Sequence, residues 1–125
     1  MQLDTDTQSP HTPLVAKLYT AVDAMNATDI VALVDENVQF RLGNFDAISG
    51  RDAVEEANVG FFETILAMHH TITGIWSSGD TVFCEGRVHY TRKDKSTHEV
   101  PFAARLGLNG AKIIDYYVYV DISGL

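Results

Sequence analysis

The clearest pattern of apolar and polar residues lies in the C-terminal third of the chain, from residue 79 to 125. Apolar or small side chains alternate there with polar ones, which is typical of strands with one buried and one exposed face. Turn signals around Gly79 and at Asn109-Gly110 divide this stretch into strands, so the pattern predicts hairpins and an antiparallel sheet. The side chains expected on the buried face are those of Val82, Cys84, Gly86, Val88, Tyr90, Val100, Phe102, Ala104 and Leu106.

The N-terminal half shows a helical period instead. Thr12-Pro13 predicts a helix start, with a hydroxyl cap followed by proline in the first turn. Thr28 is the expected cap of a short second helix, and Ser49 with Asp52 predicts a capping box before a third. The expected inward side chains are Leu14, Val15, Leu18, Val22 and Met25 of the first helix, with Tyr19 at the edge of that stripe, and Val54, Ala57, Phe61 and Ile65 of the third.

Two further strands are expected between and after these helices. Residues 36–43 alternate as a short strand does, and residues 44–50 predict a loop or a short paired strand. From residue 68 the period of two returns, and it places Met68, His70, Ile72, Gly74 and Trp76 on one face. The order of elements predicts an α+β fold in which three helices of the N-terminal half pack on one face of a curved, mainly antiparallel sheet. Such a bent sheet encloses a conical cavity at its open end.

Composition and charge narrow the classes of protein. The length of 125 residues predicts one domain, residues 12–125, preceded by a flexible tail, residues 1–11. The net charge is −8, which disfavours nucleic acid as a partner because polyanions are repelled. The single cysteine, Cys84, excludes an intrachain disulfide. No apolar run is long enough to span a membrane and the N-terminus does not resemble a signal peptide, so we expect a cytoplasmic protein without a membrane partner.

The order and spacing of several short motifs resemble the nuclear transport factor 2-like superfamily, in its SnoaL-like branch. The resemblance covers roughly residues 13–123. It rests on DIVALVDENVQFRLG, SGRDAV, His70, Gly79-Asp80, Glu85-Gly86, PFAARLGLNGAKI and YYVYVD. It implies a cystatin-like, cone-shaped α+β barrel for residues 12–125. It also implies chemistry without a cofactor, since the superfamily includes ketosteroid isomerases, limonene epoxide hydrolases, scytalone dehydratase and polyketide cyclases.

The catalytic sets of these relatives are largely missing from the chain. The general-base Asp of ketosteroid isomerases matches Leu42, and their second Asp matches Ala103 or Ala104. Their tyrosine proton donor matches Tyr19 approximately. The Arg and two Asp of limonene epoxide hydrolases match Arg87, His89 and Val118, and the Asp that pairs with the histidine of scytalone dehydratase has no match in the sequence.

His70 is the best candidate for acid–base chemistry, because strand parity places it on the concave apolar face. Tyr19, Tyr90 and Tyr116 are expected on the same face, where a hydroxyl orients a carbonyl group. We therefore take His70, Tyr19 and Tyr116 as the candidate catalytic residues. The alternative is that His70 is a core histidine bonded to the backbone or to a tyrosine.

Arg87 and His89 have the opposite parity, which predicts the convex face. A β-bulge would turn this polar pair into the pocket instead. Adjacent His69 and His70 point to opposite faces, and the spacing of His and carboxylates predicts no metal site. Cys84 is expected to be a buried apolar side chain rather than a nucleophile.

Two functions follow from these observations. The first is binding of a small, mostly apolar organic molecule in the cone, with cofactor-free isomerase, dehydratase, cyclase or hydrolase chemistry. The second is a non-catalytic ligand-binding or dimerisation module. We expect a cavity of about 300 Å³ or more beside Ala104 and Val118, and a homodimer through the convex sheet face around Phe83, Tyr117 and Tyr119. The expected pocket residues are Val15, Phe40, Leu42, Phe61, Trp76, Val88, Tyr90, Phe102, Ala104 and Val118.

Overall fold

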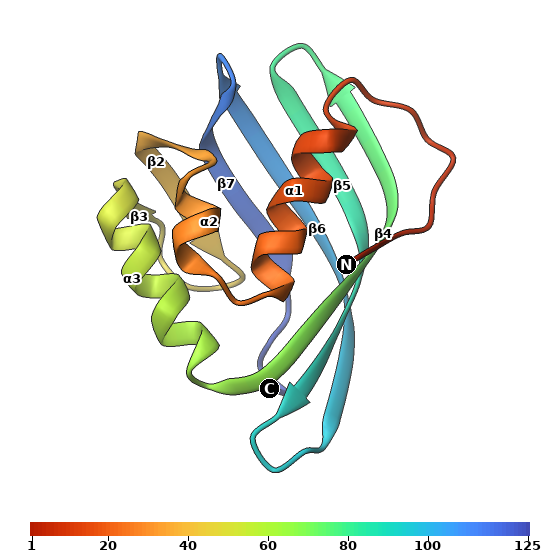
Figure 1. Ribbon diagram of the computed structural model, residues 1–125, viewed down its shortest axis with the longest axis vertical. Helices are drawn as coiled ribbons and strands as arrows, with labels where there is room; N and C mark the ends of the chain where they lie inside the picture. Colours follow the sequence, from red (N-terminus) through yellow and green to blue (C-terminus); the bar gives the residue numbers. More distant parts are fainter.

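A computed structural model describes all 125 residues as three helices on one seven-stranded sheet (Figure 1). The order of the strands across the sheet is β1-β4-β5-β6-β7-β2-β3. The helices are α1 (Thr12–Asp23), α2 (Ala27–Val31) and α3 (Arg51–Phe62). The strands are β1 (Gln2–Leu3), β2 (Val34–Leu42), β3 (Ile48–Ser49), β4 (Ile65–Ser78), β5 (Thr81–Arg92), β6 (Thr97–Asn109) and β7 (Lys112–Val120).

The sheet is mixed and bent, and all the helices cover its concave face (Figure 1). Strands β4 to β7 pair antiparallel in chain order, as the sequence predicts. Strand β2 lies parallel to β7, and β1 lies parallel to β4. The α+β cone is confirmed, but the sheet does not close into a barrel, because β1 and β3 remain at its two edges.

The helix starts differ from the predicted caps. Thr12 lies inside α1, and His11 stands at the cap position without a side-chain hydrogen bond. Asn26 rather than Thr28 caps α2, where its Oδ1 accepts from the backbone N–H of Asp29. Helix α3 begins after Gly50, whose positive φ of 95° explains why glycine stands where a serine cap was expected.

A β-bulge in β4 changes the face on which its second half lies. Ile72 pairs with Gly86 but Gly74 pairs with Glu85, so Thr73 is an extra residue in β4. The parity of the strand therefore reverses after Ile72. Trp76, expected in the pocket, lies on the outer face with 48% of its surface exposed.

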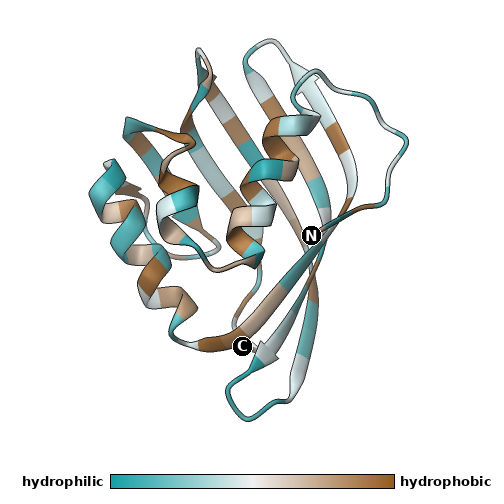
Figure 2. Ribbon diagram, in the orientation of Figure 1, coloured by the Kyte–Doolittle hydropathy of each residue, from teal (hydrophilic) through white to brown (hydrophobic).

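The core fills the space between the helices and the concave face. Figure 2 shows apolar and polar positions interspersed along the helices and strands. In α3 Val54 is buried as predicted, but Asn58 and Phe62 are buried in place of Ala57 and Phe61, so the stripe is displaced by one position after Val54. The expected inward residues of β5 and β6 are buried, apart from Gly86 and Val100, which are half-buried.

The segment expected to be a flexible tail, residues 1–11, runs along β4. Gln2 and Leu3 pair with Thr71 and Ile72. Further along, the backbone N–H of Ile75 donates to the Thr7 hydroxyl at 2.9 Å.

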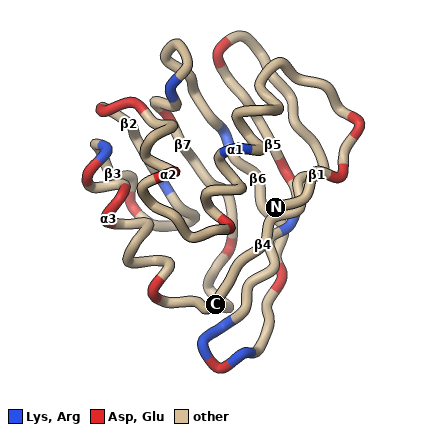
Figure 3. The backbone as a smooth tube through the Cα atoms, viewed as in Figure 1, with Lys and Arg blue, Asp and Glu red and all other residues tan.

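Charged side chains lie mainly on loops and on the exposed faces of the elements (Figure 3). Three of the basic ones gather at the tip of the β5–β6 hairpin, around Asp94, as the sequence indicates. None of the helices is long and apolar enough to cross a membrane.

Candidate functional site

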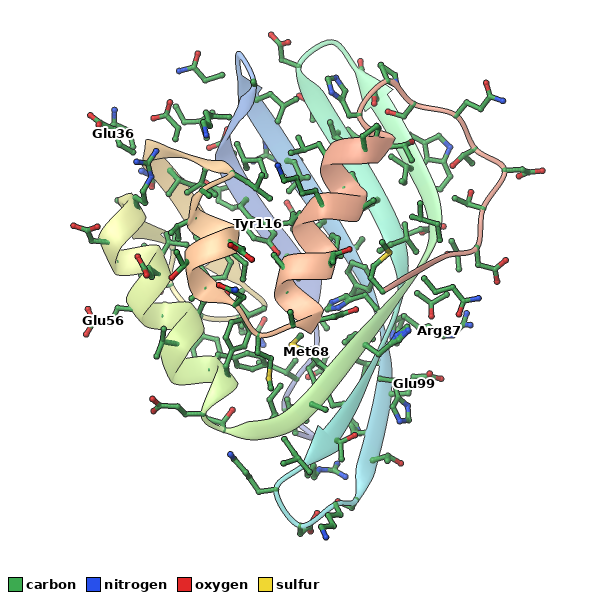
Figure 4. The ribbon with its side chains drawn as sticks, viewed as in Figure 1. Glu36, Glu56, Met68, Arg87, Glu99 and Tyr116 are labelled. Atoms are coloured by element: carbon green, nitrogen blue, oxygen red, sulfur yellow. The ribbon has the colours of Figure 1, made fainter.

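An enclosed chamber lies between the concave face of the sheet and the helices. Its volume is about 50 Å³. Figure 4 shows Tyr116 and Met68, two of its wall residues, on the helix side of the sheet. We call this space the inner chamber. Its walls are formed by Tyr19, Val22, Phe40, Leu42, Ala57, Asn58, Phe61, Phe62, Met68, His70, Tyr90, Tyr116 and Val118.

His70 enters the inner chamber from β4 and is held by Asp23 at the end of α1. The His70 ring Nδ1 lies 2.6 Å from Asp23 Oδ1, and the His70 backbone N–H donates to Oδ2 at 2.8 Å. The ammonium of Met1 lies 3.1 Å from the same Oδ2. Two contacts from one residue fix both the position and the orientation of the imidazole.

The pair sets the protonation of the site. Burial opposes ionisation of Asp23, but its hydrogen bonds and charge interaction with His70 outweigh that effect and lower its pKa. An ionised carboxylate can only accept, so the His70 Nδ1–H donates to Asp23. Nε2, the other ring nitrogen, has no hydrogen-bond partner in the protein, and His70 stands on the wall of the chamber.

Two neighbouring aromatic rings pack against the imidazole. The Tyr19 ring centroid lies 4.6 Å from that of His70, Phe102 meets the imidazole edge-on at 4.9 Å, and the Tyr19 and Phe102 centroids are 5.5 Å apart. The side chain of His70 is consequently enclosed, with little room to adopt another rotamer.

Three tyrosine hydroxyls supply hydrogen-bond donors. Burial, followed by the proximity of Tyr116 and Cys84, raises the pKa of Tyr19 well above its usual value. Burial also raises the pKa of Tyr116 and that of Tyr90, the latter to about 12. All three hydroxyls therefore remain protonated near neutral pH. The Tyr19 hydroxyl oxygen is fully buried and makes no hydrogen bond of normal geometry in the protein, and Tyr116 and Cys84 lie close to it.

The candidate catalytic residues His70, Tyr19 and Tyr116 all line the inner chamber. The ten expected pocket residues divide into three groups. Phe40, Leu42, Phe61, Tyr90 and Val118 line the chamber. Val15, Val88, Phe102 and Ala104 are buried in the core behind it, and Trp76 lies outside. The prediction of a cavity of about 300 Å³ or more beside Val118 and Ala104 is wrong in size, since the chamber beside Val118 measures about 50 Å³ and Ala104 does not line it.

Arg87 and His89 stay on the convex face. Strands β5 and β6 pair without a register shift, so no bulge turns this part of β5 inward. Arg87 Nε and His89 Nδ1 lie 3.9 and 3.8 Å from Glu99 Oε1, and all three side chains are about half exposed. Figure 4 shows Arg87 and Glu99 on the outer side of the sheet. No three His, Cys, Asp or Glu side chains converge in a metal-binding arrangement.

A second, larger cavity adjoins the first at the side of α3. Its volume is about 400 Å³, and we call it the outer chamber. It shares four side chains with the inner chamber, so a single layer of residues separates the two. The shared residues are Phe40, Leu42, Ala57 and Phe61, and the outer chamber adds Phe45, Asp46, Ile48, Gly60 and Thr64.

Sequence analysis missed Asp23 and Asn58. Asp23 follows Tyr19 by four residues, which places the two on the same side of α1, and this spacing was the available signal. Asn58 lies on the buried face of α3, where its Nδ2 donates to the carbonyl of Val54 at 2.8 Å. A polar residue four positions after Val54 was the corresponding signal in that helix.

The model of the SnoaL-like domain family matches residues 15–116. Among curated proteins, none matches the sequence significantly. Similar solved structures share the fold at low sequence identity. A protein with a ketosteroid isomerase-like fold from Catenulispora acidiphila DSM 44928, in complex with trimethylamine, has a TM-score of 0.83 at 21% identity, over 93% of this chain and 89% of that one.

Two further structures extend the comparison to other chemistries. A candidate SnoaL-like polyketide cyclase from Jannaschia sp. CCS1 has a TM-score of 0.80 at 13% identity, over 95% of this chain and 93% of that one. A limonene epoxide hydrolase-like enzyme from M. tuberculosis has a TM-score of 0.76 at 13% identity, over 88% and 81% of the two chains. At these identities the likeness establishes the fold.

Proposed function

The chain belongs to the SnoaL-like domain family, and from that premise we propose that it binds a small organic molecule in the inner chamber and performs cofactor-free acid–base chemistry on it. One observation carries this proposal. The His70–Asp23 pair stands on the wall of a small chamber beside Tyr19, and neither His70 Nε2 nor the Tyr19 hydroxyl has a hydrogen-bond partner in the protein. A base and a hydrogen-bond donor on one small cavity are the parts that proton abstraction beside a carbonyl requires.

In the proposed reaction, Nε2 of His70 takes a proton from the carbon next to a carbonyl group. The electron pair of the broken C–H bond moves to form the enolate, whose oxygen accepts hydrogen bonds from Tyr19 and Tyr116. Asp23 stabilises the imidazolium that forms. If the imidazolium N–H first exchanges with D₂O, returning the deuteron to the same carbon gives exchange, and returning the proton to another carbon gives isomerisation.

The comparisons support this proposal without identifying a substrate. The relative from C. acidiphila was solved with trimethylamine, a molecule of a few heavy atoms. The inner chamber offers a volume of about 50 Å³, which is room for about four water-sized groups. A small reactive group is therefore the part of the ligand that reaches His70.

Hydrogen–deuterium exchange tests the proposal without knowledge of the substrate. Acetone has four heavy atoms and acidic C–H bonds, so its exchange in D₂O can be followed by NMR with and without protein. We expect protein-dependent exchange, and we expect His70→Gln to reduce it at least 100-fold. The amide replaces the imidazole at similar reach, so the change in unfolding free energy should stay within about 1 kcal/mol.

The alternative function is non-catalytic ligand binding. It predicts chemical-shift changes in the chamber residues on addition of acetone, but no exchange above the background rate. In that case His70 serves as a structural residue, and His70→Gln should lower the unfolding free energy by about 1–3 kcal/mol.

Assembly is a separate part of the proposal. The outer face of the sheet exposes 48% of Trp76, 44% of Phe83 and 58% of Tyr119. Trp76, Phe83, Arg105 and Tyr117 lie opposite one another on four adjacent strands. The Arg105 guanidinium lies 4.7 Å above the Tyr117 ring. We propose that this aromatic row is a homodimer interface, because such patches usually mark contacts.

Sedimentation at micromolar concentration tests this assembly. We expect a dimer for the natural chain and a monomer for Phe83→Glu. Val59→Glu is the matched control, since Val59 is an apolar residue exposed to a similar degree on α3. A monomeric natural chain would refute the interface.

A further inference from the structure

The two chambers differ in size, polarity and charge. The inner chamber, of about 50 Å³, holds the tyrosine hydroxyls and His70, whereas the outer chamber, of about 400 Å³, is walled mainly by apolar side chains. Neither chamber has a Lys or Arg in its walls. The ionisable group of the outer chamber is Asp46, and Asp23 lies behind His70.

We infer that the ligand is an elongated molecule without an acidic group, with a polar head of about four heavy atoms in the inner chamber and an unbranched apolar tail in the outer one. This inference rests on the proposed function and names the substrate class for the same site. Three observations support it, concerning size, continuity and charge.

Size limits the head. A cavity needs about 10–15 Å³ for each water-sized group, so about 50 Å³ accommodates a carbonyl with its two neighbouring carbons and no ring system. The enclosing residues are packed core side chains, among them Tyr19 and Tyr116, which are almost fully buried. Enlarging the chamber would require these rings to move away from Phe102 and Phe40.

Continuity places the tail. The layer between the chambers is formed by the four residues that line both of them, Phe40, Leu42, Ala57 and Phe61. Ala57 has the smallest side chain of these four, so a ligand that spans both chambers would pass along it. A chain of methylene groups is narrow enough to follow this route, and it buries apolar surface against the walls of the outer chamber.

Charge excludes acids. The walls contain no cation to pair with a carboxylate, and the exposed Asp46 would repel one. The net charge of −8 opposes the approach of anions as well. Fatty acids and other carboxylates of suitable length are therefore poor ligands.

The test uses 2-alkanones from acetone to 2-octanone, with affinities from NMR titration and exchange rates in D₂O. Each added methylene should lower the dissociation constant about two- to fourfold, and the fourfold value corresponds to a methylene that is fully buried. 7-Oxooctanoate, which has the length of 2-octanone and ends in a carboxylate, should bind at least tenfold more weakly.

Two variants of α3 locate the tail. Ala57→Leu places a larger side chain between the chambers and should abolish the gain in affinity that each added methylene gives. Ala53→Leu adds the same bulk one turn earlier, on the exposed surface, where it lines neither chamber, so this variant should keep the gain in affinity. Circular dichroism melts establish that both variants fold.

The outcomes separate the two proposals. If acetone binds and exchanges but chain length changes the affinity less than twofold overall, the inference is overturned and the proposed function stands. Equal binding of 7-oxooctanoate and 2-octanone, or equal effects of the two leucine variants, also overturns it. If no alkanone binds or exchanges, both proposals fail.

Discussion

Replacing Asp23 with Asn separates the chemical role of this residue from its structural one. The carboxylate accepts two hydrogen bonds from His70, at 2.8 Å from the backbone N–H and 2.6 Å from Nδ1. An asparagine retains one oxygen, which can still accept from the backbone N–H. Its amide NH₂ then faces Nδ1 and donates to it, so the proton of the neutral imidazole moves to Nε2. The base that faces the chamber is lost while the fold is largely retained.

The magnitude follows from these two bonds. Hydrogen bonds to charged groups contribute about 1.5–3 kcal/mol each and neutral ones about 0.5–1.5 kcal/mol. Asp23→Asn weakens both without leaving a donor unpaired, so we expect a loss of about 1–2 kcal/mol. Asp23→Ala leaves both His70 donors unpaired and should cost about 2–4 kcal/mol. For a chain of 125 residues, 1 kcal/mol corresponds to about 4 °C in melting temperature.

Two assays measure these effects on the same samples. Thermal melts should rank the natural chain above Asp23→Asn and Asp23→Ala in that order. Acetone exchange should fall at least 100-fold in both variants, because a general base contributes about 10²–10⁴-fold. Thr20→Asn is the control, a substitution on the exposed side of α1 that should change neither result. Retention of the natural exchange rate by Asp23→Asn would refute the role assigned to the pair.

Four further predictions concern stability and reactivity. The pKa of Asp23 is lower in the folded protein than the unfolded value of about 3.9, so its carboxylate stabilises the fold above that pH, and this stabilisation is lost as the pH falls through the folded pKa. Urea titrations should therefore show that the difference in unfolding free energy between the natural chain and Asp23→Asn disappears below about pH 4. Tyr19→Phe removes a buried hydroxyl without a partner, so melts should show no loss of stability while acetone exchange falls about tenfold or more. Burial raises the pKa of Cys84 to about 12, so iodoacetamide at pH 8 should label this thiol in urea but not in the native protein. A Cβ at Gly86 would lie 1.9 Å from the Thr71 carbonyl oxygen, so Gly86→Ala should lower the unfolding free energy by about 3 kcal/mol in urea denaturation.

The sequence by itself determined the three helices, the strands β2 and β4 to β7, and the inward faces of most of these strands. Alternation placed Tyr90 and Tyr116 on the concave face and Arg87 on the convex one, and all three lie there in the structure. Period-two alternation reports whether each residue is buried, and burial depends mainly on which face of its own strand a residue occupies. For the same reason the helices and their order along the chain were predictable.

Tertiary structure decided the details that depend on pairs of residues. The bulge at Thr73 turned Trp76 outward, and its position follows from the register between β4 and β5 rather than from the pattern within β4. The helix caps depended on local backbone geometry, because Asn26 rather than Thr28 accepts from the N–H of Asp29, and the positive φ at Gly50 favours glycine over serine.

Only part of the candidate site could be predicted from the sequence. His70 was found by parity, but Asp23 lies 47 residues earlier, at the C-terminal end of α1. The contact exists because α1 crosses the concave face with its C-terminal end beside β4 (Figure 1). The small volume of the inner chamber likewise depends on how Tyr19, Phe102 and Tyr116 pack together, since a local pattern specifies that a side chain is buried but not which side chains it meets.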